Sequence, residues 1–191
     1  MFSAPASPSI RKVTRQLTPS YRRMIEASPF FTIATSGPRG LDCSPRGDAA
    51  GFVRIADDST LLLPERRGNN RIDSLRNLVS DSRAALLFLV PGISEILRIN
   101  GHAFLSRNRE LCDSFLVHGS VPKIVIVFQI ETVMFQCARA IIRSRLWDPS
   151  LFRTPGDVPT AGAMLADATA GEEGGAAYDA ALPERIRTTL Y

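Results

Sequence analysis

A succession of short apolar segments, each of the length of a β-strand, constrains the fold of this chain more than any other feature. The most apolar of them covers residues 123–135 and reads KIVIVFQIETVMF. Its β-branched and aromatic residues are typical of a buried strand. Turn signals separate the segments, such as GPRG at residues 37–40 and PG at residues 91–92. This alternation of strands and tight turns predicts a sheet of antiparallel strands.

The spacing of the segments predicts six or seven strands with short helices between them. A chain of this kind, mainly β with short helices (class α+β), favours a small antiparallel barrel. A doubly wound parallel sheet would need longer helices that alternate regularly with the strands, and the sequence lacks that pattern. Strands are expected over residues 30–36, 41–46, 51–56, 60–63, 84–90, 96–105 and 123–135. Helices are expected over residues 18–27, 71–80, 108–118 and 138–147.

The 191 residues suit one ordinary domain, and their composition divides them into three regions. Residues 1–17 are rich in Ser, Pro and Arg, and we expect a flexible N-terminal arm. Residues 18–149 carry the strand signals and form the barrel domain. Residues 150–191 hold many Ala, Gly and acidic residues but few large apolar ones. Such a segment buries little surface, so we expect a partly ordered C-terminal extension with one Ala-rich helix near residues 159–168.

Cysteine usage and hydropathy exclude several classes of protein. The three cysteines are scattered and form no CxxC pair, which argues against a disulfide framework or a zinc site and favours the reducing cytoplasm. No apolar run reaches the length of about 20 residues that a membrane-spanning helix needs. The N-terminus lacks the apolar core of a secretory signal. We therefore expect a soluble cytoplasmic protein without a membrane partner.

The formal net charge is +4, and nearly all of the 23 basic residues are arginine. A nucleic-acid-binding protein would gather such residues beside exposed aromatic side chains. Here the arginines are spread along the chain among Asp and Glu, and the phenylalanines lie in apolar runs. We therefore expect no nucleic-acid partner, and the position of each arginine decides its importance.

The sequence carries no motif for catalysis by its own side chains. His102 and His118 lack the spacing of metal ligands, so no metal site is expected. A GxSxG elbow, a P-loop and a GxGxxG turn are all missing from the sequence. This pattern favours a protein that borrows its chemistry from a bound cofactor.

Residues 62–78, LLPERRGNNRIDSLRNL, combine the end of an apolar strand, a basic loop and the start of a helix. Backbone N–H groups at the helix start, together with Arg66, Arg67 and Arg71, would form an anion site suited to a phosphate monoester. The alternative is that these arginines are solvated loop residues and that Asn70 caps the helix. Charge pattern alone leaves both interpretations open.

Two further basic residues lie outside this loop. Arg46 ends the second expected strand, and Arg46 or Ser44 could face the same phosphate if that strand runs beside the fourth one. Arg98 lies in the segment ILRINGHA, where alternation places it on the face opposite the apolar residues. An arginine in a strand built for burial needs a partner, either a carboxylate such as Glu95 or a ligand.

Taken in this order, these pieces resemble the pyridoxamine 5′-phosphate oxidase-like flavoproteins, the FMN-binding split-barrel family, and within it a bacterial subgroup. The matching motifs are SPFFTIATSGPRGLDCSPRGD, LLLPERRGNNRIDSLRNL and ALLFLVPGISEILRINGHAFLS, which cover residues 28–106 approximately. The segment ARAIIRSRLWDP extends the likeness to about residue 149. The resemblance implies a six- to seven-stranded antiparallel split β-barrel of the FMN-binding type.

The resemblance also implies FMN as the cofactor, held at the interface of a homodimer. In the family, the strand before the loop ends along the flavin ring, and a basic pair at the following helix holds the phosphate. A strand arginine also reaches the phosphate, and an aromatic residue of the second subunit completes the pocket. The matching residues here are Leu63, Pro64 and Glu65 along the ring, Asn70 and Arg71 at the basic pair, Arg46 with Ser44 on the strand, and Trp147 as the aromatic residue, with Arg98 as a further cofactor-binding candidate.

The function implied is that of an FMN-dependent oxidoreductase, which transfers hydride through flavin N5 to or from a small molecule, with NAD(P)H as one candidate donor. The C-terminus lacks the basic, histidine-containing segment with which pyridoxal oxidases grip a substrate phosphate, so vitamin B6 phosphate is not the expected substrate. Relatives on this fold bind heme or a deazaflavin. The alternative function is therefore a non-catalytic flavin- or heme-binding carrier or redox sensor.

Overall fold

The computed structural model describes residues 3–191, so Met1 and Phe2 lie outside the described residues. The chain divides into two compact units, with the boundary between Trp147 and Asp148. The first unit contains a β-sheet, and the second consists of helices and their connections. Within residues 3–191, no helix combines the length and the apolar character that crossing a membrane requires.

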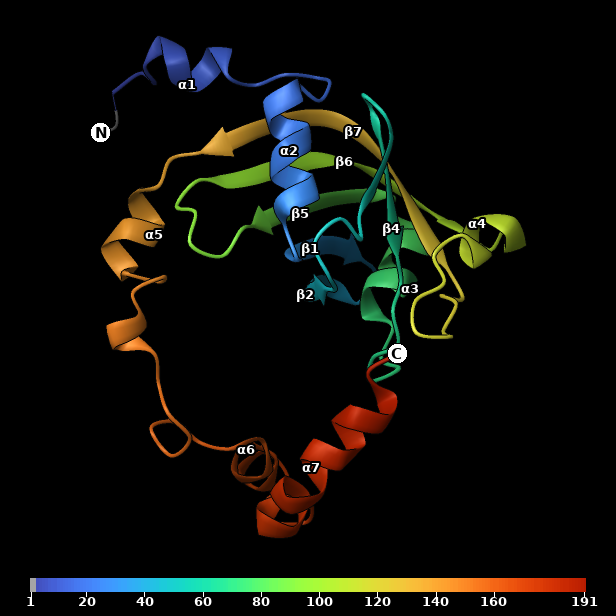
Figure 1. The fold of residues 1–191 in the computed structure, drawn as a ribbon, viewed down its shortest axis with the longest axis vertical. Coiled ribbons are helices and arrows are strands. Elements are labelled where there is room, and N and C mark those ends of the chain that lie inside the picture. The colour runs from blue at the N-terminus through green and yellow to red at the C-terminus, as the bar shows by residue number, and fades with distance from the viewer. Residues whose placement is uncertain (1–2) are drawn as a thin grey trace. The chain divides into compact units, whose positions relative to one another are not determined.

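The sheet of the first unit is antiparallel at every pairing, in the order β2-β1-β5-β6-β7-β4-β3 (Figure 1). This architecture confirms the expected class, a seven-stranded antiparallel split barrel with short helices. Every segment expected as a strand forms one, although β3 begins later than expected, after the buried Phe52 and Val53. The strands are β1 (Phe30–Gly37), β2 (Gly40–Gly47), β3 (Arg54–Asp57), β4 (Thr60–Pro64), β5 (Arg83–Leu89), β6 (Ile96–Ser106) and β7 (Val125–Gln136).

The helices of the first unit are α1 (Ser7–Arg11), α2 (Pro19–Ala27), α3 (Asp73–Ser80), α4 (Arg109–Asp113) and α5 (Arg139–Ser144). The last three all form where helices are expected, but each is shorter than expected. Left-handed residues explain this, because Ile72 before α3 and Arg145 after α5 both have a φ of 52°. After α4 the chain turns back through His118 and Gly119, whose φ values are 47° and 78°.

The core lies on one face of the sheet, where alternate residues of β1, β5 and β6 point inward. Phe88 of β5 is opposite Phe31 of β1 and Leu97 of β6, and all three are almost completely buried. Helix α2 lies over the sheet (Figure 1) and buries Tyr21 and Ile25. This packing makes the three central strands a rigid frame for the residues of their neighbours.

Strands β6 and β7 approach each other closely at Gly101. A Cβ atom there would lie 1.9 Å from the carbonyl oxygen of Gln129, so only glycine fits. The pairing register shifts at the same point, since Asn100 is opposite Thr132 whereas Gly101 is opposite Ile130. Such a bulge bends and twists a strand pair, which helps the sheet to curl.

The N-terminal residues contribute in part to the first unit. Thr14 and Val133 exchange backbone hydrogen bonds of 2.9 and 2.8 Å, and Leu17 is buried. Helix α1 buries no side chain. The flexibility expected for residues 1–17 stays a prediction.

The second unit contains η1 (Pro149–Leu151), α6 (Ala161–Ala168) and α7 (Gly175–Thr189). Helix α6 coincides with the Ala-rich helix expected near residues 159–168, whereas composition gives no sign of α7. The carboxylate of Asp179 accepts hydrogen bonds from Thr160 Oγ1 at 2.6 Å and from the backbone N–H of Gly162 at 2.7 Å. These polar contacts join α6 to α7 without burying a large apolar side chain, which is why a search for apolar residues misses α7.

Candidate functional site

The two ends of the curled sheet meet without pairing. Strand β2 stands at one end of the strand order and β4 near the other, so the condition that these two strands run side by side is not met. The curl of the sheet instead brings Arg46 of β2 to Glu65, which follows β4, with 3.0 Å between Nε and Oε2. Helix α3 packs against β1, β2 and β6, and its first turn reaches the same point. We call this meeting point the split of the barrel.

The guanidinium of Arg46 is held by three contacts at the split. Besides the bond to Glu65, Nη1 donates to the carbonyl oxygen of Pro45 at 2.9 Å, and Nη2 donates to Ser74 Oγ at 3.3 Å. The Arg46 side chain is only 17% exposed. A guanidinium has five N–H groups, so these bonds leave one N–H on Nη1 and one on Nη2 for a further acceptor.

Asp42 orients two hydroxyl groups beside Arg46. Ser74 Oγ donates to Asp42 Oδ2 at 2.6 Å, and Ser44 Oγ is 3.0 Å from each Asp42 oxygen. Neither Asp42 nor Ser74 was among the residues predicted from the sequence. Strand alternation could have indicated Asp42, because positions 42, 44 and 46 share one face of β2. Ser74 carries no such signal, since its place at the split depends on the packing of α3.

The loop before α3 runs through residues in the left-handed region. Asn70 has a φ of 61°, and Ile72 occupies the N-cap position with no side-chain cap on the helix. The alternative that Asn70 caps α3 is therefore wrong. Asn69 Oδ1 instead accepts from the backbone N–H of Arg71 at 3.1 Å. The first-turn N–H groups of α3 thus lack the capping oxygen that Thr18 supplies to α2.

Arg71 lies at the surface beside this helix start. Its Nε donates to Asp73 Oδ2 at 2.8 Å, and Arg39 Nη2 donates to the other oxygen of Asp73 at 3.3 Å. These contacts, the hydrogen bond from Arg71 above all, lower the pKa of Asp73. The Arg71 side chain is 75% exposed, so Arg71 can change partner far more freely than Arg46.

The other residues of the strand end and loop differ in burial, since Leu63 and Pro64 are buried and Arg66 is mostly so, whereas Arg67 is exposed. Leu63 and Pro64 are buried, and their backbone pairs with β7. The side chain of Arg66 donates to Asp48 Oδ2 at 2.8 Å and to the carbonyl oxygen of Phe115 at 2.9 Å. Arg66 is therefore engaged within the chain rather than solvated, and its role as an anion ligand stays a prediction.

Arg98 lies on the opposite face of the sheet from Arg46. Its register partners are Leu87 and Met134, and its Nη2 is 3.9 Å from the Met134 sulfur. Among residues 3–191, no carboxylate lies within 4.0 Å of this guanidinium, so the expected ion pair with Glu95 does not form. The half-buried Arg98 therefore has no counter-charge within its own chain in the part that the structure describes.

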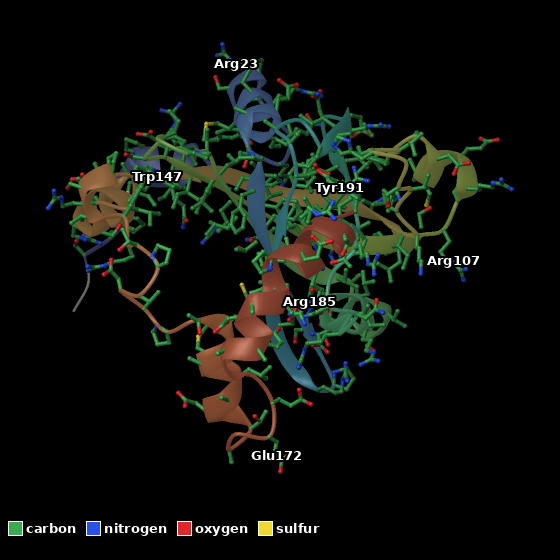
Figure 2. All side chains as sticks on the ribbon, turned by 60° about the horizontal axis from the view of Figure 1, so that its bottom comes forward. Arg23, Arg107, Trp147, Glu172, Arg185 and Tyr191 are labelled. Atoms are coloured by element: carbon green, nitrogen blue, oxygen red, sulfur yellow. The ribbon has the colours of Figure 1, made fainter. Side chains whose placement is uncertain are left out.

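Trp147 ends the first unit beside α5 (Figure 2). Its indole N–H donates to the carbonyl oxygen of Ile93 at 2.8 Å. Helices α5 and α3 lie well apart (Figure 1), so a single chain does not bring Trp147 to Arg46. The structure thus brings Ser44, Arg46 and Glu65 together, with Asn70 and Arg71 on the adjoining loop.

Burial governs the protonation of Glu65. Its side chain is 20% exposed, and desolvation raises the pKa of the carboxyl group above its ordinary value. The nearby charge of Arg46 and the hydrogen bond from it act in the opposite direction but do not cancel the effect of burial.

The seven-stranded antiparallel sheet with short helices is the fold of the FMN-binding split-barrel proteins. The sequence model of the family described as pyridoxamine 5′-phosphate oxidase matches residues 17–137, and the chain belongs to this family. The family is of the flavin-binding, oxidoreductase type.

Solved structures agree with this fold. A histidine-to-alanine variant of HupZ of Group A Streptococcus superposes with a TM-score of 0.51 at 19% identity over 62% of this chain and 98% of that chain. A second structure of HupZ gives a TM-score of 0.50 at 20% identity over 61% of this chain and 91% of that chain. At this identity the likeness shows the fold alone. A search of curated proteins found no match.

Substitution of Glu65 by Gln is expected to stabilise the protein at neutral pH. The pKa of Glu65 in the folded protein lies above its ordinary value of 4.5. The wild-type protein therefore loses free energy of unfolding as the pH rises through the raised pKa, because the buried carboxyl group then has to ionise. Gln does not titrate and still offers an oxygen to Arg46. Urea unfolding at a series of pH values measures the free energy of unfolding of both proteins. The difference in favour of the variant should increase as the pH rises above about 4 and should then become constant. A pH-independent difference would contradict this expectation.

Proposed function

We propose that this protein is an FMN-dependent oxidoreductase that transfers hydride through flavin N5 to or from a small molecule. The observation that carries the proposal is the fixed guanidinium of Arg46 beside the uncapped start of α3, in a chain of the pyridoxamine 5′-phosphate oxidase family. When bound, FMN supplies hydride chemistry, which side chains alone cannot provide. Residues 3–191 contain no cluster of metal-ligating side chains that could serve instead.

The residues at the split fit a terminal phosphate. Arg46 keeps two N–H groups for an acceptor, and a charge-assisted, forked contact is the strongest that a phosphate makes with a side chain. The uncapped first turn of α3 adds backbone N–H groups and the positive end of the helix dipole. Arg71 and Asn70 on the adjoining loop provide further donors for the phosphate. Arg71 would leave its ion pair with Asp73 to bind the phosphate.

The flavin ring then extends along the end of β4. Glu65 contacts Arg46 directly, so a phosphate on Arg46 lies next to the strand end formed by Leu63, Pro64 and Glu65. The buried backbone of this strand end gives a rigid edge against which a planar ring can be oriented. Ser44 contributes through Asp42, which ties its hydroxyl to the same network.

The functional form is a homodimer with the cofactor at the subunit interface. Arg98 faces away from the core without a carboxylate partner among residues 3–191, and a half-buried guanidinium requires a counter-charge or a ligand. A second copy packed on this face of the sheet would supply one. Trp147 follows α5 and would then complete the cleft of the other subunit, in keeping with the separation of α5 from α3 (Figure 1). The free thiols of Cys43, Cys112 and Cys137 suit a cytoplasmic location.

The second candidate is a non-catalytic flavin-binding carrier or redox sensor. It is favoured by the network at the split, in which Glu65 is paired with Arg46 and Asp42 accepts from Ser74, so that neither carboxylate is without a partner before a substrate arrives. A heme would need an axial ligand such as His, Cys, Met or Tyr, and the side chains of this network include none of them. A deazaflavin that carries a phosphate would use the same contacts as FMN.

Substitution of Arg46 by Ala is expected to weaken FMN binding by about 10- to 100-fold, because the phosphate loses a charge-assisted partner. The quenching of flavin fluorescence during titration measures the dissociation constant. Arg187→Ala removes an exposed arginine that pairs with Glu184 in the second unit, and it should bind FMN like the wild type. Equal affinities for all three proteins would refute the phosphate site.

Reduction of the bound flavin separates the two candidate functions. For an oxidoreductase, NADH or NADPH added without oxygen should bleach the flavin absorbance of the holoprotein, and air should restore it. Reduction by dithionite but by neither nicotinamide, nor by a panel of small reducing substrates, would favour the carrier or sensor.

Reversal of the charge at Arg98 tests the homodimer. Arg98→Glu is expected to convert a dimer into a monomer in sedimentation or light-scattering measurements, because the second subunit would face an unpaired carboxylate. Arg109→Glu alters an exposed arginine of α4 and should leave the dimer intact. A monomeric wild type, or a dimer unaffected by Arg98→Glu, would rule out this interface.

A further inference from the structure

Two carboxylates flank the single guanidinium of the proposed phosphate site, and the inference drawn from them rests on the proposed function. Glu65 contacts Arg46 directly, with 3.0 Å between Oε2 and Nε. Asp42 reaches Arg46 through Ser74, whose Oγ lies 2.6 Å from Asp42 and 3.3 Å from Arg46 Nη2. At the split, therefore, two negative charges share one positive charge before any ligand binds.

The hydroxyl groups at the split cannot offset these negative charges. A serine hydroxyl has one O–H to donate, and those of Ser74 and Ser44 are both directed at Asp42. Their oxygens remain acceptors only, which suits Arg46 but not a phosphate. Of the side chains in this network, Arg46 alone can donate to the phosphate.

The charged groups on the elements around Glu65 are otherwise paired among themselves or exposed. Arg66 is paired with Asp48, while Arg71 and Arg39 share Asp73 at the start of α3. From these elements the surrounding groups are Arg46 and Asp42 on β2, Asp48 after β2, Arg39 before β2, Arg66, Arg67 and Arg71 on the loop, Asp73 and Arg76 on α3, and Lys123 before β7. Arg46 is the one that contacts Glu65.

A phosphate on the remaining N–H groups of Arg46 brings a second anion to the guanidinium that already holds Glu65. Two like charges around one site favour protonation of one of them. Glu65 is the group disposed to accept the proton, because its carboxylate is mostly buried and burial already disfavours its charge. The phosphate keeps its charge, since it gains the backbone N–H groups of α3 as well.

We propose that Glu65 tunes the phosphate affinity of this site: ionised Glu65 weakens phosphate binding at Arg46, and the carboxyl group of Glu65 becomes more fully protonated, taking up part of a proton from solvent, when the phosphate binds. Its contribution therefore makes cofactor affinity rise as the pH falls. At higher pH the same residue favours release of the cofactor. Glu65 acts through Arg46 and is a positioning residue rather than a catalytic one.

The test compares FMN dissociation constants of the wild type and Glu65→Gln from about pH 5 to about pH 8. The ligand titrates identically with both proteins, so the ratio of the two constants isolates Glu65. We expect Glu65→Gln to bind FMN about five- to tenfold more tightly at the alkaline end, and this advantage to disappear at the acidic end. Glu131→Gln removes an exposed carboxylate that faces His102 and should match the wild type at every pH.

Titration calorimetry of the wild type and Glu65→Gln provides a second measurement. At the pH where the ratio of the two dissociation constants changes most steeply, binding in buffers of different ionisation enthalpy should show greater proton uptake by the wild type than by the variant. A ratio of dissociation constants that does not change with pH, weaker binding by Glu65→Gln at alkaline pH, or equal proton uptake by the two proteins would overturn the inference while FMN binding itself stands. Failure of the wild type to bind FMN would overturn the proposed function, and the inference with it.

Discussion

The ion pair between Arg46 and Glu65 is the contact on which the candidate site depends. It joins β2 to the end of β4, where the curled sheet forms no backbone hydrogen bonds, so side chains rather than a strand ladder close the split of the barrel. A backbone ladder would have used the polar groups at this point for pairing. Closure by side chains leaves one N–H on Nη1 and one on Nη2 of Arg46 beyond the three bonds that hold it. Because the pair is mostly buried, removing Arg46 would leave the carboxylate of Glu65 as a desolvated charge.

The rest of the first unit supports this contact as a rigid frame. Strands β1, β5 and β6 pack their inward side chains into one core, and α3 brings Ser74 to the split from the other side. A frame of this kind can orient a cofactor without contributing a nucleophile, which explains how a chain with no catalytic motif can belong to a family of oxidoreductase type. HupZ has the same fold at about one fifth identity, so the pattern of burial, more than particular residues, specifies the barrel.

Strand positions could be predicted because alternation and turn residues are local properties of the chain. Helix ends could not, since they depend on single residues such as Ile72 and Arg145 that adopt left-handed conformations without being glycine. Helix α7 was missed for a different reason, because polar contacts to Asp179 rather than apolar burial join it to α6. At the site, Arg46 and Ser44 were found from their strand, whereas Ser74 required knowledge of how α3 packs.

By itself, the sequence determined the positions and antiparallel direction of the strands, the loop before α3 and the place of Arg46 at the end of β2. These features depend on near neighbours along the chain, whose spacing is visible in the sequence. Only the tertiary structure decided which charged groups meet: Arg46 with Glu65, Arg66 with Asp48, and Arg98 with no carboxylate among residues 3–191. The reason is physical, because the curl of a twisted sheet sums small contributions from every strand pair, and no single segment encodes where its two ends come together.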